Sequence, residues 1–468
     1  MHFFDNSYFF KKIRPHAHNG AVLAVGSYIE AMGRFGSAKG AQMDGSLLLQ
    51  TSSTDHLETR PRTGEAPFGL DELFFSRTDA RGVLQAWSAV FARVAHHPPE
   101  RLKGAPHRII RHEQMPKGVF WLMWEAIKSG QRFGGYVLNK SSDDLQYWVY
   151  AVVTPIADGF TSVRLKPSSA LFPKVQALYA QALAAERDEG LSPEASGHRI
   201  LAALAAMGYP TYAAFASASL GMEITARDAA LGRPLDRRIM LISAMREMVH
   251  DLVSEQQVLL TQMNAMRLVP VNMRIMAARI ERAGGALSAI SDNYRTLSAE
   301  VAEQLAIFVQ DGTPETTFTY RAMERALFLT ASARLLVEAA DAFRVETTTH
   351  ARADLTSGVD ILQEVDRLNA LEEETQARAS EAFRNANQRT IRRESQAVNL
   401  GRAILSLDSI RIMCRVENER LQDRESGLSA VVSALDGYHK DMAQKLETIL
   451  GFTQNLREHA QTLEAMRH

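Results

Sequence analysis

The sequence predicts an α/β domain built on a five-stranded antiparallel sheet with helices, followed by a long all-α helical hairpin or bundle. The composition changes near residue 170: all four tryptophans and most glycines and prolines precede it, whereas the rest is rich in Ala, Glu, Arg, Leu and Met. The first part carries short β-rich runs between polar turns, and the second carries apolar residues at helical spacing. Sheet and bundle are therefore expected in different parts of the chain.

Bulk composition narrows the class of protein. The chain has 468 residues, of which 46% are hydrophobic and 23% are charged, as in ordinary globular domains. Its net charge of −1 gives no electrostatic footprint for nucleic acid. The single cysteine, Cys414, excludes an internal disulfide, and no apolar run approaches the ~20 residues of a membrane span. We therefore expect a soluble cytoplasmic protein that binds no nucleic acid and spans no membrane.

The sheet is expected within residues 69–168. Two short strands flank a turn from Asp79 to Gly82, where glycine accommodates a left-handed conformation. Helical segments follow, the last of them in "KGVFWLMWEAIKSG". Three β-rich runs complete the sheet: "RFGGYVLNK", "QYWVYAVVTPI" and "GFTSVRLKP". The face of the sheet without these helices must be covered by another domain, a partner or the N-terminal segment.

Beyond the sheet the chain reads as helices. Residues 238–310 carry heptad-like apolar steps on two arms, with a bend expected near Pro270 and Gly284. Arms of this kind usually bury their apolar stripes by dimerising, so we expect a homodimer. The predicted organisation is an N-terminal extension (1–68), the sheet domain (69–170), a helical linker (171–236), a helical hairpin (237–312) and a C-terminal helical region (313–468).

Residues 71–167 carry the most specific signal. It lies in "FSRTDARGVLQAWSAVFARV", "GAPHRIIRHEQMPKGVFWLMWEAIKSG", "GYVLNKSSDDLQYWVYAVVTPI" and "SVRLKP". In residue order and spacing this stretch resembles the PAS domains of bacterial aerotaxis receptors. The resemblance implies noncovalent FAD and the sensing of redox state or oxygen-linked energy status. By position, the flavin pocket of that family corresponds here to Arg111, His112, Trp124 and Asn139.

These side chains suit a flavin chemically. Arg111 and His112 can donate charge-assisted hydrogen bonds to a pyrophosphate or ring edge, Trp124 can stack on the ring, and Asn139 offers both a donor and an acceptor. In a protein without a ligand, the tryptophan would be a core residue and the arginine and histidine would be solvated. A haem held by His107 is the alternative ligand, although no separate feature of the sequence supports it, and no spacing of ligands predicts a metal site.

A second resemblance lies in "VNMRIMAARIERAGGALSAISDNYRTLSAEV", residues 271–301. This segment is similar to the hairpin tip of methyl-accepting chemotaxis receptors, in a degenerate form with Asn293 where glutamate is expected. The resemblance implies contact with the chemotaxis histidine kinase and its coupling protein, with Glu281, Arg282 and Arg295 as the contacting residues. An ordinary helical hairpin with a Gly-Gly turn is the alternative.

Three functions compete. The leading hypothesis is a PAS-containing signal transducer that senses redox state or oxygen through a flavin and relays it through the helical hairpin. The first alternative is a scaffold or dimerisation protein with an empty PAS domain, in which Trp87 fills part of the pocket. The second is a histidine-kinase-like protein with His250 as phosphoacceptor, but residues 300–468 contain no ATP-binding boxes. No P-loop or nucleophile elbow is present either, so we expect no enzyme.

Overall fold

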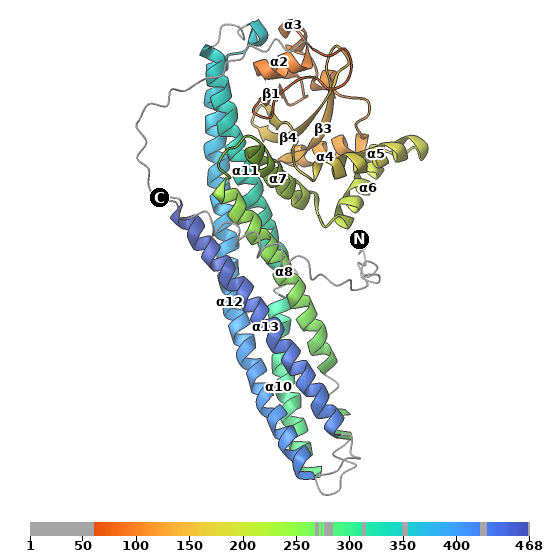
Figure 1. Ribbon diagram of the computed structural model, residues 1–468, viewed down its shortest axis with the longest axis vertical. Helices are drawn as coiled ribbons and strands as arrows, with labels where there is room; N and C mark the ends of the chain where they lie inside the picture. Colours follow the sequence, from red (N-terminus) through yellow and green to blue (C-terminus); the bar gives the residue numbers. More distant parts are fainter. Residues whose placement is uncertain are drawn as a thin grey trace. The chain divides into compact units, whose positions relative to one another are not determined.

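The computed structural model describes most of the chain beyond residue 59 (Figure 1). Two compact units divide the sequence, Met1–Glu58 and Thr59–His468, and every described residue belongs to the second. The described ranges are 60–266, 271–272, 274–275, 284–310, 315–348, 354–421 and 428–466. Most of the predicted N-terminal extension and the predicted bend at Pro270 lie outside them.

The five-stranded antiparallel sheet is confirmed. Its strands follow the order β2-β1-β5-β4-β3, so that the first and last parts of the domain lie beside one another at its centre. Gly82 adopts a φ of +77° in the turn between the first two strands, as the sequence predicts. The bounds are β1 (Leu73–Asp79), β2 (Leu84–Trp87), β3 (Phe133–Lys140), β4 (Gln146–Ile156) and β5 (Gly159–Leu165).

Four short helical elements connect β2 to β3. The Ser88 side chain caps the first of them by accepting from the backbone of Phe91, and Pro99 begins the second at the position where a missing N–H costs nothing. Gly130, with a φ of +74°, follows the last helix. The elements are α2 (Ala89–Ala95), α3 (Pro99–Leu102), the 3₁₀ turn η1 (His107–Ile110) and α4 (Lys117–Lys128).

The other face of the sheet is covered by helices of the same chain. Helix α7 (Tyr212–Ala230) packs on β3, and α11 (Glu315–Thr348) packs on β1 and β5. Phe75 of β1 meets Phe343 edge to face, with ring centroids 4.8 Å apart. Helices α5 (Phe172–Asp188) and α6 (Pro193–Ala206) come between the sheet and α7 in the chain. The sequence left open whether another domain, a partner or the N-terminal segment covers this face. The structure shows that further helices of the same chain cover it.

The long helices form a four-helix core within one chain. It comprises α8 (Arg237–Met266), α10 (Gly284–Gln310), α12 (Ile361–Leu421) and α13 (Leu428–Ala465) (Figure 1). The predicted stripes lie inside it, since Leu252, Tyr294, Val301 and Leu435 are each no more than 1% exposed. The stripes are thus buried against α12 and α13, not against a second copy as the homodimer argument assumed.

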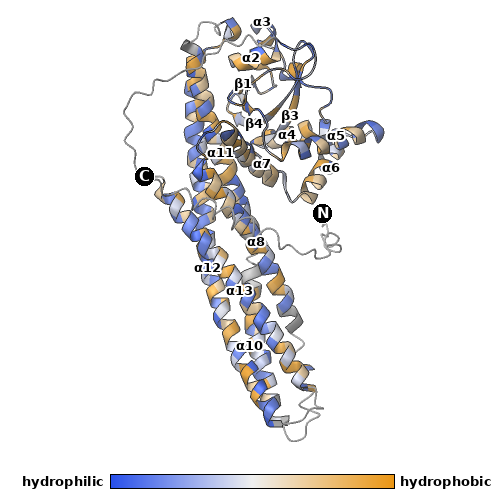
Figure 2. Cartoon of the chain, viewed as in Figure 1, coloured by the Kyte–Doolittle hydropathy of each residue, from blue (hydrophilic) through white to orange (hydrophobic). Residues whose placement is uncertain are grey.

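Hydrophilic and hydrophobic residues alternate along these helices, as the hydropathy colours in Figure 2 show. Among the described helices, none combines the length and the hydropathy that crossing a membrane requires.

Candidate functional site

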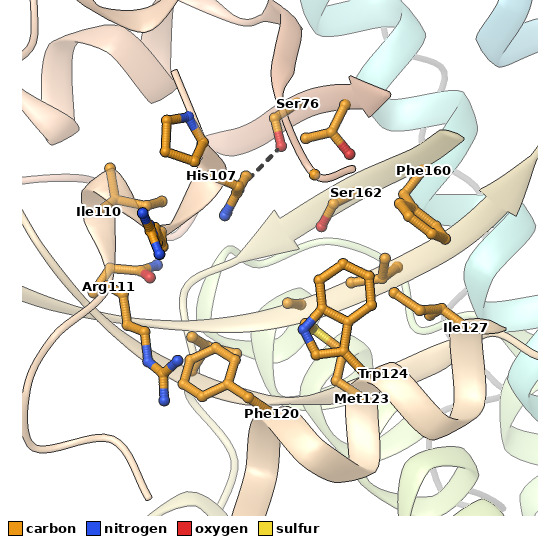
Figure 3. Close-up of a pocket in the computed structure, with 18 of the residues that line it drawn as sticks. Ser76, His107, Ile110, Arg111, Phe120, Met123, Trp124, Ile127, Phe160 and Ser162 are labelled. Atoms are coloured by element: carbon orange, nitrogen blue, oxygen red, sulfur yellow. Dashed lines mark hydrogen bonds between the residues drawn. The ribbon is translucent and has the colours of Figure 1, made fainter. Parts of the chain in front are cut away.

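A cavity of about 460 Å³ lies between the sheet and the helices that connect β2 to β3 (Figure 3). Strands contribute alternate residues to it because side chains two apart share one face of a sheet. Phe120, Met123, Trp124 and Ile127 of α4 form the opposite wall, at the three- and four-residue spacing of one helix face. The volume falls in the range of small-molecule sites.

Two buried polar atoms at this cavity lack hydrogen-bond partners among the described residues. They are Nδ2 of Asn139 on β3 and Oγ of Ser162 on β5, in residues that are 3% and 5% exposed. Both residues line the cavity. A buried polar atom left unpaired costs about 1–3 kcal/mol, so each such atom in a native protein calls for a partner. The pair is therefore a sign that something polar is accommodated between them.

A buried arginine supplies positive charge at the same wall. Arg164 of β5 is 4% exposed, and no carboxylate among the described ion pairs neutralises it. Its guanidinium donates to Ser76 Oγ at 3.0 Å and to His107 Nε2 at 2.7 Å. Burial lowers the pKa of Arg164 to about 10, so the group stays charged at neutral pH. The cavity is thus positive and suits an electron-rich or anionic group.

His107 is held neutral beside this arginine. Burial, followed by the charge of Arg164, lowers the pKa of His107 to about 3. Its Nε2 atom accepts from Arg164 and also lies 3.4 Å from Ser76 Oγ (Figure 3). Because this nitrogen is already engaged, the geometry does not fit a haem ligand. No cluster of His, Cys, Asp or Glu in the described part of the chain has the arrangement of a metal site.

Arginines surround the exposed side of the cavity. Arg111 is exposed, and its guanidinium lies 3.6 Å from the ring centroid of Phe120 (Figure 3). Arg81 and Arg108 are exposed lining residues as well. Partial desolvation of its guanidinium lowers the pKa of Arg111, and the negative charge of Glu186 acts in the opposite direction.

Three of the four residues predicted for a flavin line the cavity, and one does not. Arg111, Trp124 and Asn139 lie together there, although they come from the η1 end, α4 and β3. His112 is not among the lining residues; its Nδ1 atom accepts from the backbone N–H of Gln114 at 3.0 Å. The structure therefore does not place His112 with the other three.

Trp87 does not fill the pocket. It is fully buried in a separate cluster that also contains residues of α2, and its indole N–H donates to the carbonyl of Leu355 at 2.9 Å. The expectation that Trp87 occupies part of the cavity is wrong, because its side chain contacts the segment between α11 and α12 instead.

Of the residues predicted to contact a partner, only Arg295 is described. It is exposed on α10 and lies 3.9 Å from Asp292 one turn earlier. Glu281 and Arg282 lie outside the described residues.

Sequence reasoning missed Ser76, Ser162 and Arg164 as cavity residues. A usable signal exists in "GFTSVRLKP", where Phe160, Ser162 and Arg164 alternate with Thr161 and Val163. In a strand that is buried on both faces, a polar residue and an arginine on one face indicate a cavity on that side.

Comparison with known proteins agrees in part with this picture. No model of a known protein family matches the chain. The chain resembles the aerotaxis receptor of Escherichia coli K12. The two are 31% identical over 118 residues, which is 24% of this chain and 23% of the receptor. The chain thus matches less than a quarter of the length of that relative.

Proposed function

We propose that the cavity binds FAD and that the chain is a signal transducer of the chemotaxis or aerotaxis type. The observation that carries the proposal is the unpaired Asn139 Nδ2 and Ser162 Oγ, which lie on the sheet side of a cavity whose α4 wall is apolar and aromatic. Polar atoms at two fixed points match the donors and acceptors along the edge of a flat heteroaromatic ring. The similarity to the aerotaxis receptor supports the same function.

The chain's own residues would divide the work of holding such a group. Bound flavin supplies a ring whose charge and protonation change with its redox state. Trp124 and Phe120 offer aromatic surfaces on α4, and Asn139 and Ser162 offer hydrogen bonds from the sheet. The exposed arginines Arg81, Arg108 and Arg111 are suited to a pyrophosphate outside the cavity. Arg164 would favour any state of the ring that carries negative charge.

The test is the colour and FAD content of purified protein, before and after incubation with FAD. Asn139→Leu and Ser162→Ala are expected to weaken FAD binding about tenfold or more, because each removes an uncharged hydrogen-bond partner of the flavin from a buried site. Gln85→Leu, at an exposed position of β2, is the matched control. Folded protein that stays colourless after reconstitution would refute the proposal and favour the scaffold alternative.

We propose that β1 relays the state of the cavity to the helices. Ser76 lines the cavity, while its neighbour Arg77 points to the opposite face and binds Glu364 of α12 at 2.8–3.0 Å. Hydrogen exchange in residues 361–371 should therefore change when FAD binds, and Arg77→Gln should abolish that change. Exchange that responds to FAD equally in both proteins would exclude this route.

For the output we propose the chemotaxis histidine kinase and its coupling protein as partners, reached in the cytoplasm through the α8–α10 hairpin, with no catalysis by this chain. Arg295→Glu is expected to weaken co-purification with both partners, and Arg402→Glu, equally exposed on α12, serves as the control. Equal recovery of the partners with both variants would remove Arg295 from the proposal.

A homodimer remains part of the proposal, on a different surface from the one first expected. Helix α12 exposes four aliphatic side chains at intervals of seven residues, a period that suits packing against another helix. They are Ile391, Val398, Leu405 and Ile412, from 38% to 69% exposed.

A further inference from the structure

A second concave site lies between α11 and α12, and the proposed flavin function does not use it. Its volume is about 340 Å³, within the range of small-molecule clefts. On α11 the lining residues are spaced by three, four and seven, and on α12 by three, four, seven and eleven, so each set occupies one helix face. We call this site the arginine cleft; it is lined by Phe318, Arg321, Ala322 and Arg325 of α11 and by Arg378, Glu381, Ala382, Asn385 and Arg389 of α12.

The arginine cleft holds an excess of positive charge. Four guanidinium groups line it against one carboxylate, that of Glu381. Arg378 pairs with Glu374 one turn away at 2.5 Å, whereas Arg321 and Arg325 enter no ion pair within the described part of the chain. Like charges that face one another on two packed helices are unfavourable unless a counterion or ligand neutralises them.

A fifth arginine strengthens this field from the sheet domain. Arg132, just before β3, donates through Nη2 to Thr375 Oγ1 of α12 at 2.7 Å. Its Nη1 atom is buried and has no hydrogen-bond partner among the described residues. Burial, and then the charge of Arg378, lowers the pKa of Arg132 to about 10. The same positive cluster therefore reaches from both long helices to the domain that carries the cavity.

One side of the arginine cleft is aromatic. Phe318 is 50% exposed, which is unusual for a large apolar side chain, and the guanidinium of Arg389 lies 5.4 Å from its ring centroid. An exposed ring beside several arginines offers a surface on which a flat base can stack while phosphates meet the guanidinium groups. Asn385 adds a donor and an acceptor at the same wall.

We propose that the arginine cleft binds a small phosphate-bearing polyanion. Arg321, Arg325 and Arg378 hold the phosphate groups, since planar guanidinium groups bind phosphate oxygens in pairs. Two sources share this chemistry, a nucleoside diphosphate or triphosphate and an inorganic polyphosphate. Only the nucleotide uses Phe318. Because the ligand bridges α11 and α12, its binding stabilises the contact between these two helices.

The experiment is calorimetric titration of the full chain with ADP, inorganic pyrophosphate and adenosine, each at two salt concentrations. ADP, pyrophosphate or both should bind saturably and more weakly at high salt, and adenosine should not bind. Arg321→Gln and Arg325→Gln should each weaken phosphate binding about tenfold. Arg384→Gln, an exposed arginine of α12 outside the cleft, should change nothing.

Further outcomes separate the sources and could overturn the proposal. If Phe318→Leu weakens ADP but not pyrophosphate, the ligand is a nucleotide; if the two anions bind equally well and Phe318→Leu affects neither, it is inorganic. The proposal fails if neither anion saturates below about 1 mM. It also fails if Arg384→Gln weakens binding as much as Arg321→Gln does. Circular dichroism should show all variants folded. Without ligand, Arg321→Gln and Arg325→Gln should melt at unchanged or higher temperatures, since each removes a repelling charge from the cleft.

Discussion

Replacing Glu223 should weaken the attachment of α7 to the sheet. Its side chain is fully buried and accepts four hydrogen bonds: from Tyr136 Oη of β3 at 2.7 Å, from Ser169 Oγ at 2.6 Å, and from the backbone N–H groups of Ser168 and Ser169 at 2.6 and 3.0 Å. Burial, and then this carboxylate, raise the pKa of Tyr136, so its hydroxyl remains a donor. One residue thus ties together α7, β3 and the chain that follows β5.

The size of this loss of stability depends on which of the four donors can find another hydrogen-bond acceptor. In Glu223→Ala the two hydroxyls can rotate toward each other, since Tyr136 Oη and Ser169 Oγ are only 3.4 Å apart. The two backbone N–H groups cannot, and a buried unpaired donor costs about 1–3 kcal/mol. We therefore expect Glu223→Ala to lower the free energy of unfolding by about 4 kcal/mol, and Tyr136→Phe to lower it by about 1 kcal/mol.

Urea unfolding followed by tryptophan fluorescence measures this loss, because all four tryptophans lie between residues 87 and 148, in the sheet domain. Glu373→Ala, at an exposed position of α12, should stay within about 0.5 kcal/mol of the unchanged protein. A loss below about 1 kcal/mol for Glu223→Ala would show that the N–H groups are satisfied in another way, and the reasoning would be refuted.

Three further predictions test packing, titration and assembly. Gly134→Ala should lower the free energy of unfolding by about 2 kcal/mol, because the added Cβ would lie 2.5 Å from the Phe328 ring. Gly437→Ala, where the added Cβ meets open space, should instead stabilise α13 by ~0.5–1 kcal/mol, and thermal melts of the two variants measure both effects. Burial raises the pKa of Glu324 to about 7, so stability should fall as pH rises from about 4.5 to 7; Glu324→Gln should flatten that slope, by at most ~3 kcal/mol, in urea titrations across pH. Leu405→Glu should shift the mass measured by light scattering from dimer to monomer, and a mass unchanged by the substitution would exclude the α12 surface.

The local parts of the fold could be predicted because local sequence determines them. Gly82 accepts the positive φ of a tight turn, and Gly130 ends a helix in the same way. The run of β-branched and aromatic residues in "QYWVYAVVTPI" favours a strand whatever it pairs with. Local sequence does not determine which surface an apolar helix face packs against. Leu252 and Tyr294 mark buried stripes, but an apolar stripe is equally satisfied by a second copy or by α12 and α13, so the bundle within one chain could not be predicted.

The candidate site shows the same division. Trp124 and Asn139 were predicted by family resemblance, and both line the cavity. His112 was predicted beside Arg111 but lies outside, because Arg111 has extended backbone angles (φ −74°, ψ 129°) and neighbours in extended chain point in opposite directions. The alternation in β5 groups Ser162 and Arg164 on one face and so indicates a cavity on that side, but only the structure shows that this face lies over the cavity while α11 packs on β5.

The link between the sheet and the bundle constrains how a signal can travel. Glu364, 2% exposed at its side chain, pairs with Arg77 near the start of α12, and the same helix supplies Leu407 and Cys414 to the bundle core. Breaking a buried pair by removing one partner costs about 3–5 kcal/mol, more than a change of ligand state readily provides. The pair should therefore remain closed and move with β1. Because α12 runs for 61 residues, about 90 Å, without a proline, a movement that begins at Glu364 can be carried along the helix, and a shift of helix position is the output that this architecture favours.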